Sequence, residues 1–171
     1  SLNKLNVTIF EGLGRFTTQN ELEIINPKTK KIINKVSSKK ILISVGGKPN
    51  KLNIPGIDLA WTSDDIFELE KFPKSILIVG GGYIACEFAS IFKNLGTKVT
   101  QLIRGQSLLN GFDEDLSSCL EESPTFTGIN IISNTQLKSI ARVNENLEST
   151  LDSGEKILTN NILIAIGREP N

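Results

Sequence analysis

The stretch SILIVGGGYIACEFASIFKNLGTKVTQLIR, residues 75–104, decides the fold. Residues 75–79 are an apolar run that predicts a buried strand, and glycines follow this run directly. Residues 85–95 then place apolar side chains at helical spacing up to Gly96, a typical helix C-cap, and residues 98–103 are a second apolar run. The order strand, glycine turn, helix and strand predicts a βαβ unit, whose two strands pair in parallel.

The glycine turn fits the pattern G-x-G-x-x-A through Gly80, Gly82 and Ala85. In dinucleotide-binding proteins the first glycine permits a tight turn and the second lets the backbone approach a pyrophosphate. The small third residue allows helix and strand to pack closely, and amides at the helix start face the phosphates. A glycine-rich turn that binds nothing is the alternative interpretation. The cofactor-binding residues predicted here are Gly80, Gly81, Gly82, Tyr83, Ile84 and Ala85.

The end of the second strand indicates which nucleotide binds. In NAD-binding proteins of this kind, an acid about 20 residues after the first glycine hydrogen-bonds the ribose hydroxyls. Ile103 stands in its place, Arg104 follows, and no acid occurs between Gly96 and Asp113. An aliphatic residue removes repulsion toward a 2′-phosphate, and a guanidinium binds such a phosphate well. The pattern therefore favours NADPH over NADH, the alternative being that Arg104 is only a solvated charge at a strand end.

The remaining elements extend this unit into an α/β fold. Apolar patterning predicts strands, helices and a meander, with a linker at 48–58. The expected strands are 6–10, 21–25, 31–36, a buried 40–45, 129–133 and 161–166; the helices are 64–70 and 113–122; the meander covers 136–159. The fold class is therefore a Rossmann-like βαβ dinucleotide-binding domain with a parallel sheet and an antiparallel meander, preceded by β-strands.

Two segments resemble each other. ILISVGGKPN at 41–50 and ILIAIGREPN at 162–171 share six of ten residues. We interpret them as two equivalent exits from a nucleotide-binding domain into a neighbouring one. Coincidence between two buried strands of similar composition is the alternative.

Composition restricts the function. The formal net charge is zero, whereas nucleic acids and anionic membranes attract a basic face, so neither is an expected partner. The chain has no histidine, the commonest general base and metal ligand, and no metal site is predicted.

Cys86 and Cys119 form no CxxC pair, which favours a reducing compartment and a cytoplasmic location. Cys86 is interpreted as a packing residue. The absence of methionine leads us to expect a piece of a longer protein.

These segments together resemble the disulfide reductase flavoenzymes, most of all the glutathione reductase branch of that family. The similarity runs through ILISVGGKPNKLNIPG, TSDDIFELEKFPKSILIVGGGYIACEFA, IRGQSLLNGFDEDL and LIAIGREPN. The resemblance implies an enzyme in which NADPH reduces FAD, FAD reduces a cysteine pair, and the pair reduces glutathione disulfide. It also implies three parts: 1–50 from an FAD-binding domain, 51–168 as the NAD(P)H-binding domain, and 169–171 returning to the FAD domain.

The resemblance also assigns roles to single residues. Tyr83 would cover the flavin and move aside for the nicotinamide, and Glu87 would be the acid near the flavin. Arg104 would bind the 2′-phosphate. Further cofactor contacts are implied for Asn110, Ile166, Gly167, Arg168, Gly14 and Gly46, the last two toward FAD. As alternatives, Tyr83 could simply pack at a helix start, and Glu87 and Arg168 could be ordinary surface charges.

The chain departs from the family pattern at Asn110, where relatives usually carry a second arginine, and this weakens the expected selectivity for NADPH. The redox cysteine pair and the family's C-terminal histidine are absent, so the chain alone is expected to be inactive, and the full-length protein to be a homodimer. The second interpretation within the same superfamily is a relative of lipoamide dehydrogenase or mercuric reductase. A non-catalytic NADPH-binding module is an alternative of another class.

Overall fold

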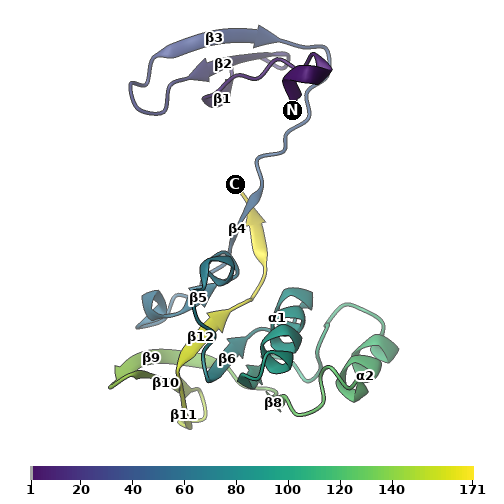
Figure 1. Ribbon diagram of the computed structural model, residues 1–171, viewed down its shortest axis with the longest axis vertical. Coiled ribbons are helices and arrows are strands. Elements are labelled where there is room, and N and C mark those ends of the chain that lie inside the picture. The colour runs from purple at the N-terminus through teal and green to yellow at the C-terminus, as the bar shows by residue number, and fades with distance from the viewer. Residues whose placement is uncertain (1) are drawn as a thin grey trace. The chain divides into compact units, whose positions relative to one another are not determined.

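The structure is a computed structural model that describes residues 2–171 and separates into two compact units, Ser1–Val45 and Gly46–Asn171. Figure 1 labels most of their helices and strands along the chain. Of the helices within residues 2–171, none has the length and apolar composition that crossing a membrane requires.

The first unit is built on an antiparallel sheet in the order β1-β2-β3. Its elements are η1 Leu2–Leu5, β1 Leu13–Phe16, β2 Glu21–Ile25 and β3 Ile32–Ser37. The chain turns between β2 and β3 because Asn26 Oδ1 accepts hydrogen bonds from the backbone N–H groups of Lys28 and Thr29, at 2.9 and 3.0 Å. The predicted strands 21–25 and 31–36 are thus confirmed, and they pair antiparallel as a hairpin.

A charged triad joins the three strands of this sheet. Glu23 of β2 is buried, and its carboxylate binds Arg15 of β1 at 2.8 Å and Lys35 of β3 at 3.1 Å. Hydrogen bonds from Arg15 and then Lys35 lower the pKa of the Glu23 carboxyl. The buried acid is therefore compensated by one cation from each neighbouring strand.

Two strand predictions in the first 45 residues are wrong. Residues 6–10 are irregular, and β1 lies later, at 13–16, because a short turn from β2 closes that hairpin at a lower entropic cost. Residues 41–45 are also irregular and belong to none of the four sheets of the described chain. Leu42 is 89% exposed, so the apolar run is not a buried strand here. An apolar run becomes one only where neighbouring strands pair with it and cover it.

The second unit contains the expected parallel sheet, with strands in the order β5-β12-β6-β7-β8. All four pairings in this sheet are parallel, which confirms the α/β fold class. Its elements are β4 Gly47–Pro49, η2 Ile57–Leu59, β5 Trp61–Thr62, η3 Asp65–Glu68, β6 Ser75–Val79, α1 Tyr83–Asn94, β7 Lys98–Leu102, α2 Glu114–Glu122, β8 Asn130–Ile132, β9 Leu137–Val143, β10 Asn146–Leu151, β11 Lys156–Thr159, β12 Asn161–Ile164 and β13 Arg168–Pro170.

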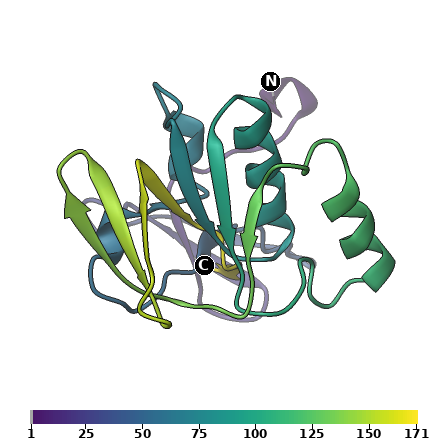
Figure 2. The ribbon, with the colours of Figure 1, turned by 90° about the horizontal axis from the view of Figure 1, so that it is seen from below.

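Two cores cover the opposite faces of the parallel sheet. Successive side chains of a strand point to opposite faces, so Ile76 and Ile78 of β6 enter one core with α1. Leu77 and Val79 enter the other core, formed with the antiparallel meander β9–β11. Figure 2 shows α1 and the meander on either side of the sheet. This sandwich holds the strand ends of the sheet in place.

The two similar sequence segments meet in space. Their second halves form strands β4 and β13, which pair antiparallel in a sheet of their own. Asn50 N donates to Gly167 O at 3.0 Å, and the equivalent Asn171 N donates to Gly46 O at 3.3 Å. Both glycines adopt positive φ, 72° for Gly46 and 108° for Gly167. The repeated Gly-x-x-Pro-Asn pattern is therefore self-complementary, because each copy closes the ladder of the other.

Candidate nucleotide-binding site

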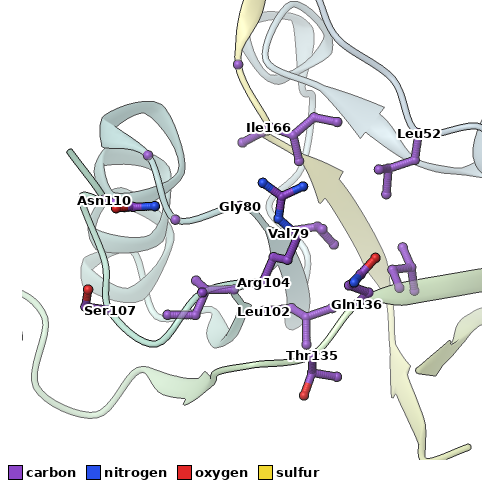
Figure 3. A pocket seen from close by; sticks show the side chains of 17 residues that line it. Leu52, Val79, Gly80, Leu102, Arg104, Ser107, Asn110, Thr135, Gln136 and Ile166 are labelled. Atoms are coloured by element: carbon purple, nitrogen blue, oxygen red, sulfur yellow. The ribbon is translucent and has the colours of Figure 1, made fainter. Parts of the chain in front are cut away.

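A cavity of about 460 Å³ lies at the carboxyl ends of β6, β7 and β12 (Figure 3). Its lining comes chiefly from the glycine turn 80–82 and from residues 102–105, 135–137 and 165–167, which follow successive strands. Ligands of open parallel sheets bind at this edge, and the volume falls within the roughly 300–1,000 Å³ of small-molecule sites. The cavity is therefore the candidate functional site.

Gly80 allows three strands to converge at the cavity. Its φ is 139°, and its N–H donates to Leu102 O of β7 at 2.9 Å. A Cβ added to Gly80 would lie 2.2 Å from the backbone oxygen of Ala165, which follows β12. Only glycine fits this position, since any side chain would collide with a backbone that cannot move aside.

The start of α1 faces the cavity. Gly82 is the N-cap, and because glycine has no side chain, no side-chain oxygen caps the helix. The first backbone N–H groups of α1 are therefore left for another acceptor. A Cβ added to Gly82 would meet no atom within 4 Å, so space is open above this backbone. Open space, free amides and the positive end of the helix dipole together favour an anion such as a pyrophosphate.

Arg104 brings a positive charge to the same cavity. Its side chain is exposed, and within residues 2–171 it makes no hydrogen bond or ion pair with the protein. Figure 3 shows it reaching from the end of β7 into the space between the labelled residues. Ile103 beside it is buried, and its Cγ2 would lie 3.2 Å from a Cβ at Gly81. The aliphatic residue thus supports the glycine turn, while the guanidinium remains available to a ligand.

The structure brings half of the predicted site residues to this cavity. Those that line it are Gly80, Gly81, Gly82, Arg104, Asn110, Ile166 and Gly167. The others predicted on α1 lie outside the lining: Ala85 is buried and Ile84 half-buried in the core, whereas Tyr83 and Glu87 are exposed. Gly46 adjoins β4, and Gly14 lies in β1 of the first unit.

Arg168 is not among the residues that line the cavity. Its Nη1 donates to Ser63 Oγ at 2.9 Å and to Asp64 Oδ1 at 2.6 Å, and its Nη2 donates to Gly47 O. The side chain therefore ties β13 to β4 and to the loop before η3. These contacts give Arg168 a structural role, and the predicted cofactor contact stays a prediction.

Sequence reasoning missed the polar segment after β8. Thr135 and Gln136 line the cavity, and Thr135 N donates to Ile103 O at 3.3 Å. Ser107 also lines it. A signal for Thr135 and Gln136 was present in the sequence, because they are polar residues shortly after an apolar strand. Parallel strands end at the same edge of a sheet, so polar residues at that point are expected near the site.

Asp65 stabilises the loop that holds Arg168. Its Oδ2 accepts hydrogen bonds from Thr62 N at 2.6 Å and Thr62 Oγ1 at 2.7 Å. These bonds, the backbone one first, lower the pKa of the Asp65 carboxyl. A lowered pKa in the folded state means stabilisation that is present above the usual value of 3.8 and is lost as pH falls through the lowered one.

We therefore expect Asp65→Asn to reduce stability at pH values above 3.8, and the deficit to shrink as the pH falls below that value. Because the carboxylate is exposed, the loss should be about 1 kcal/mol or less, or about 2–4 °C in melting temperature. Thermal melts of Asp65→Asn and of the control Asp58→Asn, taken from pH 7 down to about 3, test this. A constant deficit at every pH would contradict the role of the Asp65 charge.

The parallel sheet, the glycine turn and the open helix N-terminus define a dinucleotide-binding domain of the Rossmann type. The comparison with protein families goes one step further. The chain belongs to the pyridine nucleotide-disulphide oxidoreductase family, whose model matches residues 2–171. Family membership and the flavoprotein neighbours imply a pyridine nucleotide and a flavin as cofactors.

Similar proteins include glutathione reductases from Nostoc sp., 38% identical over 99% of this chain and 38% of that protein, and from Burkholderia cepacia, 35% identical over 99% and 36%. A mercuric reductase from Staphylococcus aureus is 31% identical over 96% of this chain and 31% of its own length. Among solved structures, HOCl-induced flavoprotein disulfide reductase RclA from Escherichia coli has a TM-score of 0.82 at 27% identity, covering 97% of this chain and 37% of that one. The chain thus spans less than two-fifths of each relative.

Proposed function

We propose that this chain is the NADPH-binding portion of an FAD-dependent disulfide reductase that acts on glutathione disulfide. Bound NADPH supplies the hydride that reduces the flavin, from which electrons pass through a cysteine pair to the substrate disulfide. The full-length protein is proposed to be a cytoplasmic homodimer. The similarity to glutathione reductases along nearly the whole chain supports the choice of substrate.

Different residues of the cavity bind different parts of the nucleotide. The amides of Gly81 and Gly82, with the N-terminus of α1, bind the pyrophosphate. Arg104 binds the 2′-phosphate, with Asn110 as a neutral donor nearby. Gly167, beside the cavity on the β12 side, lies along the nicotinamide half. Tyr83 and Glu87, both on α1 and both exposed, are the residues proposed to face the flavin.

Domain assignments belong to the same proposal. Residues 1–50 are assigned to an FAD-binding domain, 51–168 to the NAD(P)H-binding domain and 169–171 to the return strand. The antiparallel pairing of β4 with β13 supports two adjacent connections, one leaving and one entering the FAD domain.

One observation carries the choice of NADPH: the Arg104 guanidinium lies at a cavity edge with no acid beside it on β7 or in the turn that follows. A buried or protein-paired arginine would have to lose its partners before binding a phosphate. The absence of an acid at position 103 also counts against the NAD-linked lipoamide dehydrogenases.

The 171-residue chain is expected to bind NADPH more tightly than NADH. A hydrogen bond to a charged group contributes about 1.5–3 kcal/mol, which corresponds to roughly 10–100-fold in affinity. Isothermal calorimetry with the two nucleotides at matched ionic strength measures this ratio. Equal affinities would remove the role proposed for Arg104, and no binding of either nucleotide would remove the proposed function itself.

A further inference from the structure

We propose that Gln101 is a positioning residue of the nucleotide site. Its side-chain amide holds the peptide between Gly80 and Gly81 so that the Gly81 N–H faces the pyrophosphate. This inference rests on the nucleotide-binding function proposed above, and it concerns a residue that touches no ligand itself.

Gln101 is a buried polar side chain beneath the glycine turn. It lies in β7, which pairs with β6 on one side and β8 on the other, and its side chain is 0% exposed. Its Nε2 donates a hydrogen bond to Gly80 O at 2.9 Å. The side chain therefore reaches across from β7 to the first residue of the turn that follows β6.

The planarity of the peptide bond converts this contact into an orientation. In a trans peptide the C=O and the following N–H point in opposite directions. Because Gly80 O points into the interior toward Gln101, the Gly81 N–H points away from it, on the side where Gly81 lines the cavity. Leu109 N donates to Gly81 O at 2.7 Å, which orients the Gly82 N–H in the same way. Within residues 2–171, neither amide donates to a protein oxygen.

The peptide between Gly80 and Gly81 needs such an anchor. Glycine adopts positive and negative φ almost equally well, so a peptide flanked by two glycines rotates more freely than others. Rotation by half a turn would present Gly80 O, a partial negative charge, to the phosphates. The hydrogen bond from Gln101 selects the orientation that attracts an anion over the one that repels it.

The cost of burying Gln101 supports a functional role. In the described part of the chain, Gln101 Oε1 has no hydrogen-bond partner, and an unpaired buried oxygen destabilises the folded state. Cys86 Sγ lies 3.7 Å from Gln101 Nε2 and 3.8 Å from Gly81 O. Burial raises the pKa of the Cys86 thiol, which keeps it neutral beside the turn. An apolar residue at position 101 would avoid the orphan oxygen but could not hold Gly80 O.

Two apolar variants, Gln101→Leu and Gln101→Met, test this proposal with two probes. NADPH contains the pyrophosphate, whereas adenosine 2′-monophosphate offers only the group bound by Arg104. We expect NADPH affinity to fall about tenfold in both variants. This corresponds to the loss of one hydrogen bond to a charged group, the one from the Gly81 N–H to the pyrophosphate. Affinity for adenosine 2′-monophosphate should stay within about twofold, because that site is independent of the turn. The melting temperature should change little, because removal of the unpaired Oε1 offsets loss of the hydrogen bond to Gly80 O.

Unchanged NADPH affinity in a folded variant would overturn the proposal. A parallel loss for both probes would overturn it as well, because it would indicate a general structural role. Unfolding of both variants would contradict the argument that the buried amide serves the turn and not stability. Failure of the wild-type chain to bind NADPH would instead refute the proposed function. Arg104→Glu is expected to lose affinity for both NADPH and adenosine 2′-monophosphate, and this pattern distinguishes the Arg104 site from the glycine turn.

Discussion

Replacing Arg104 by glutamate is expected to remove the proposed preference for NADPH. The substitution deletes the cation at the cavity edge and places an acid next to the position where NAD-binding relatives of this fold carry one. NADPH affinity should fall by about 10–100-fold or more, because the lost charge-assisted hydrogen bond is replaced by repulsion of the 2′-phosphate. NADH affinity should be kept or should rise. Competition titrations of the two nucleotides against both proteins measure the change.

The matched control is Arg142→Glu, which makes the same change of charge on an exposed residue of β9 that does not line the cavity. It should leave the NADPH to NADH ratio unchanged. If both variants lost NADPH affinity equally, the effect would come from the overall charge of the protein and not from the position of Arg104.

Gly80→Ala is expected to be the most destabilising single substitution in the glycine turn. The new Cβ would lie 2.2 Å from Ala165 O at a φ of 139°, so steric overlap adds to backbone strain. We expect a loss of about 3 kcal/mol or more in the free energy of unfolding, or roughly 6–12 °C in melting temperature. Thermal melts and urea denaturation of the second unit provide the measurement.

Gly82→Ala separates folding from binding in the same turn. Gly82 has φ −78° and no atom within 4 Å of an added Cβ, so stability should change by only about 0.5 kcal/mol. The methyl group would project into open space next to the proposed pyrophosphate, and NADPH affinity should fall. Equal destabilisation by the two substitutions would show that the contact with Ala165 is not what requires a glycine at position 80.

Local patterning was enough to predict the central elements. β6, α1 and β7 occupy the segments where apolar runs, helical spacing and Gly96 placed them, because each signal arises within a few residues. The predicted helix 113–122 is also confirmed, since α2 spans Glu114–Glu122 and ends before Pro124. The position of Arg104 at the cavity follows from the same patterns, because parallel strands end at a common edge.

Residues 41–45 show where such patterning fails. Their composition resembles that of β12, yet they are irregular and residues 42–45 are exposed, whereas Ile162, Leu163 and Ile164 are buried. The difference lies in neighbours: β12 pairs with β5 and β6, and no sheet of the described residues includes 41–45. Burial of an apolar strand depends on partners that its own sequence does not specify.

The sequence by itself determined that a glycine turn joins a strand to a helix, and that a cation follows the second strand. Only the tertiary structure decided that Arg168 turns to Asp64, that Gln101 holds Gly80 O, and that Thr135 joins the cavity. The physical reason is range. Periodicity and turn chemistry act between residues a few positions apart, whereas these contacts join residues that lie close together only after the sheet has assembled.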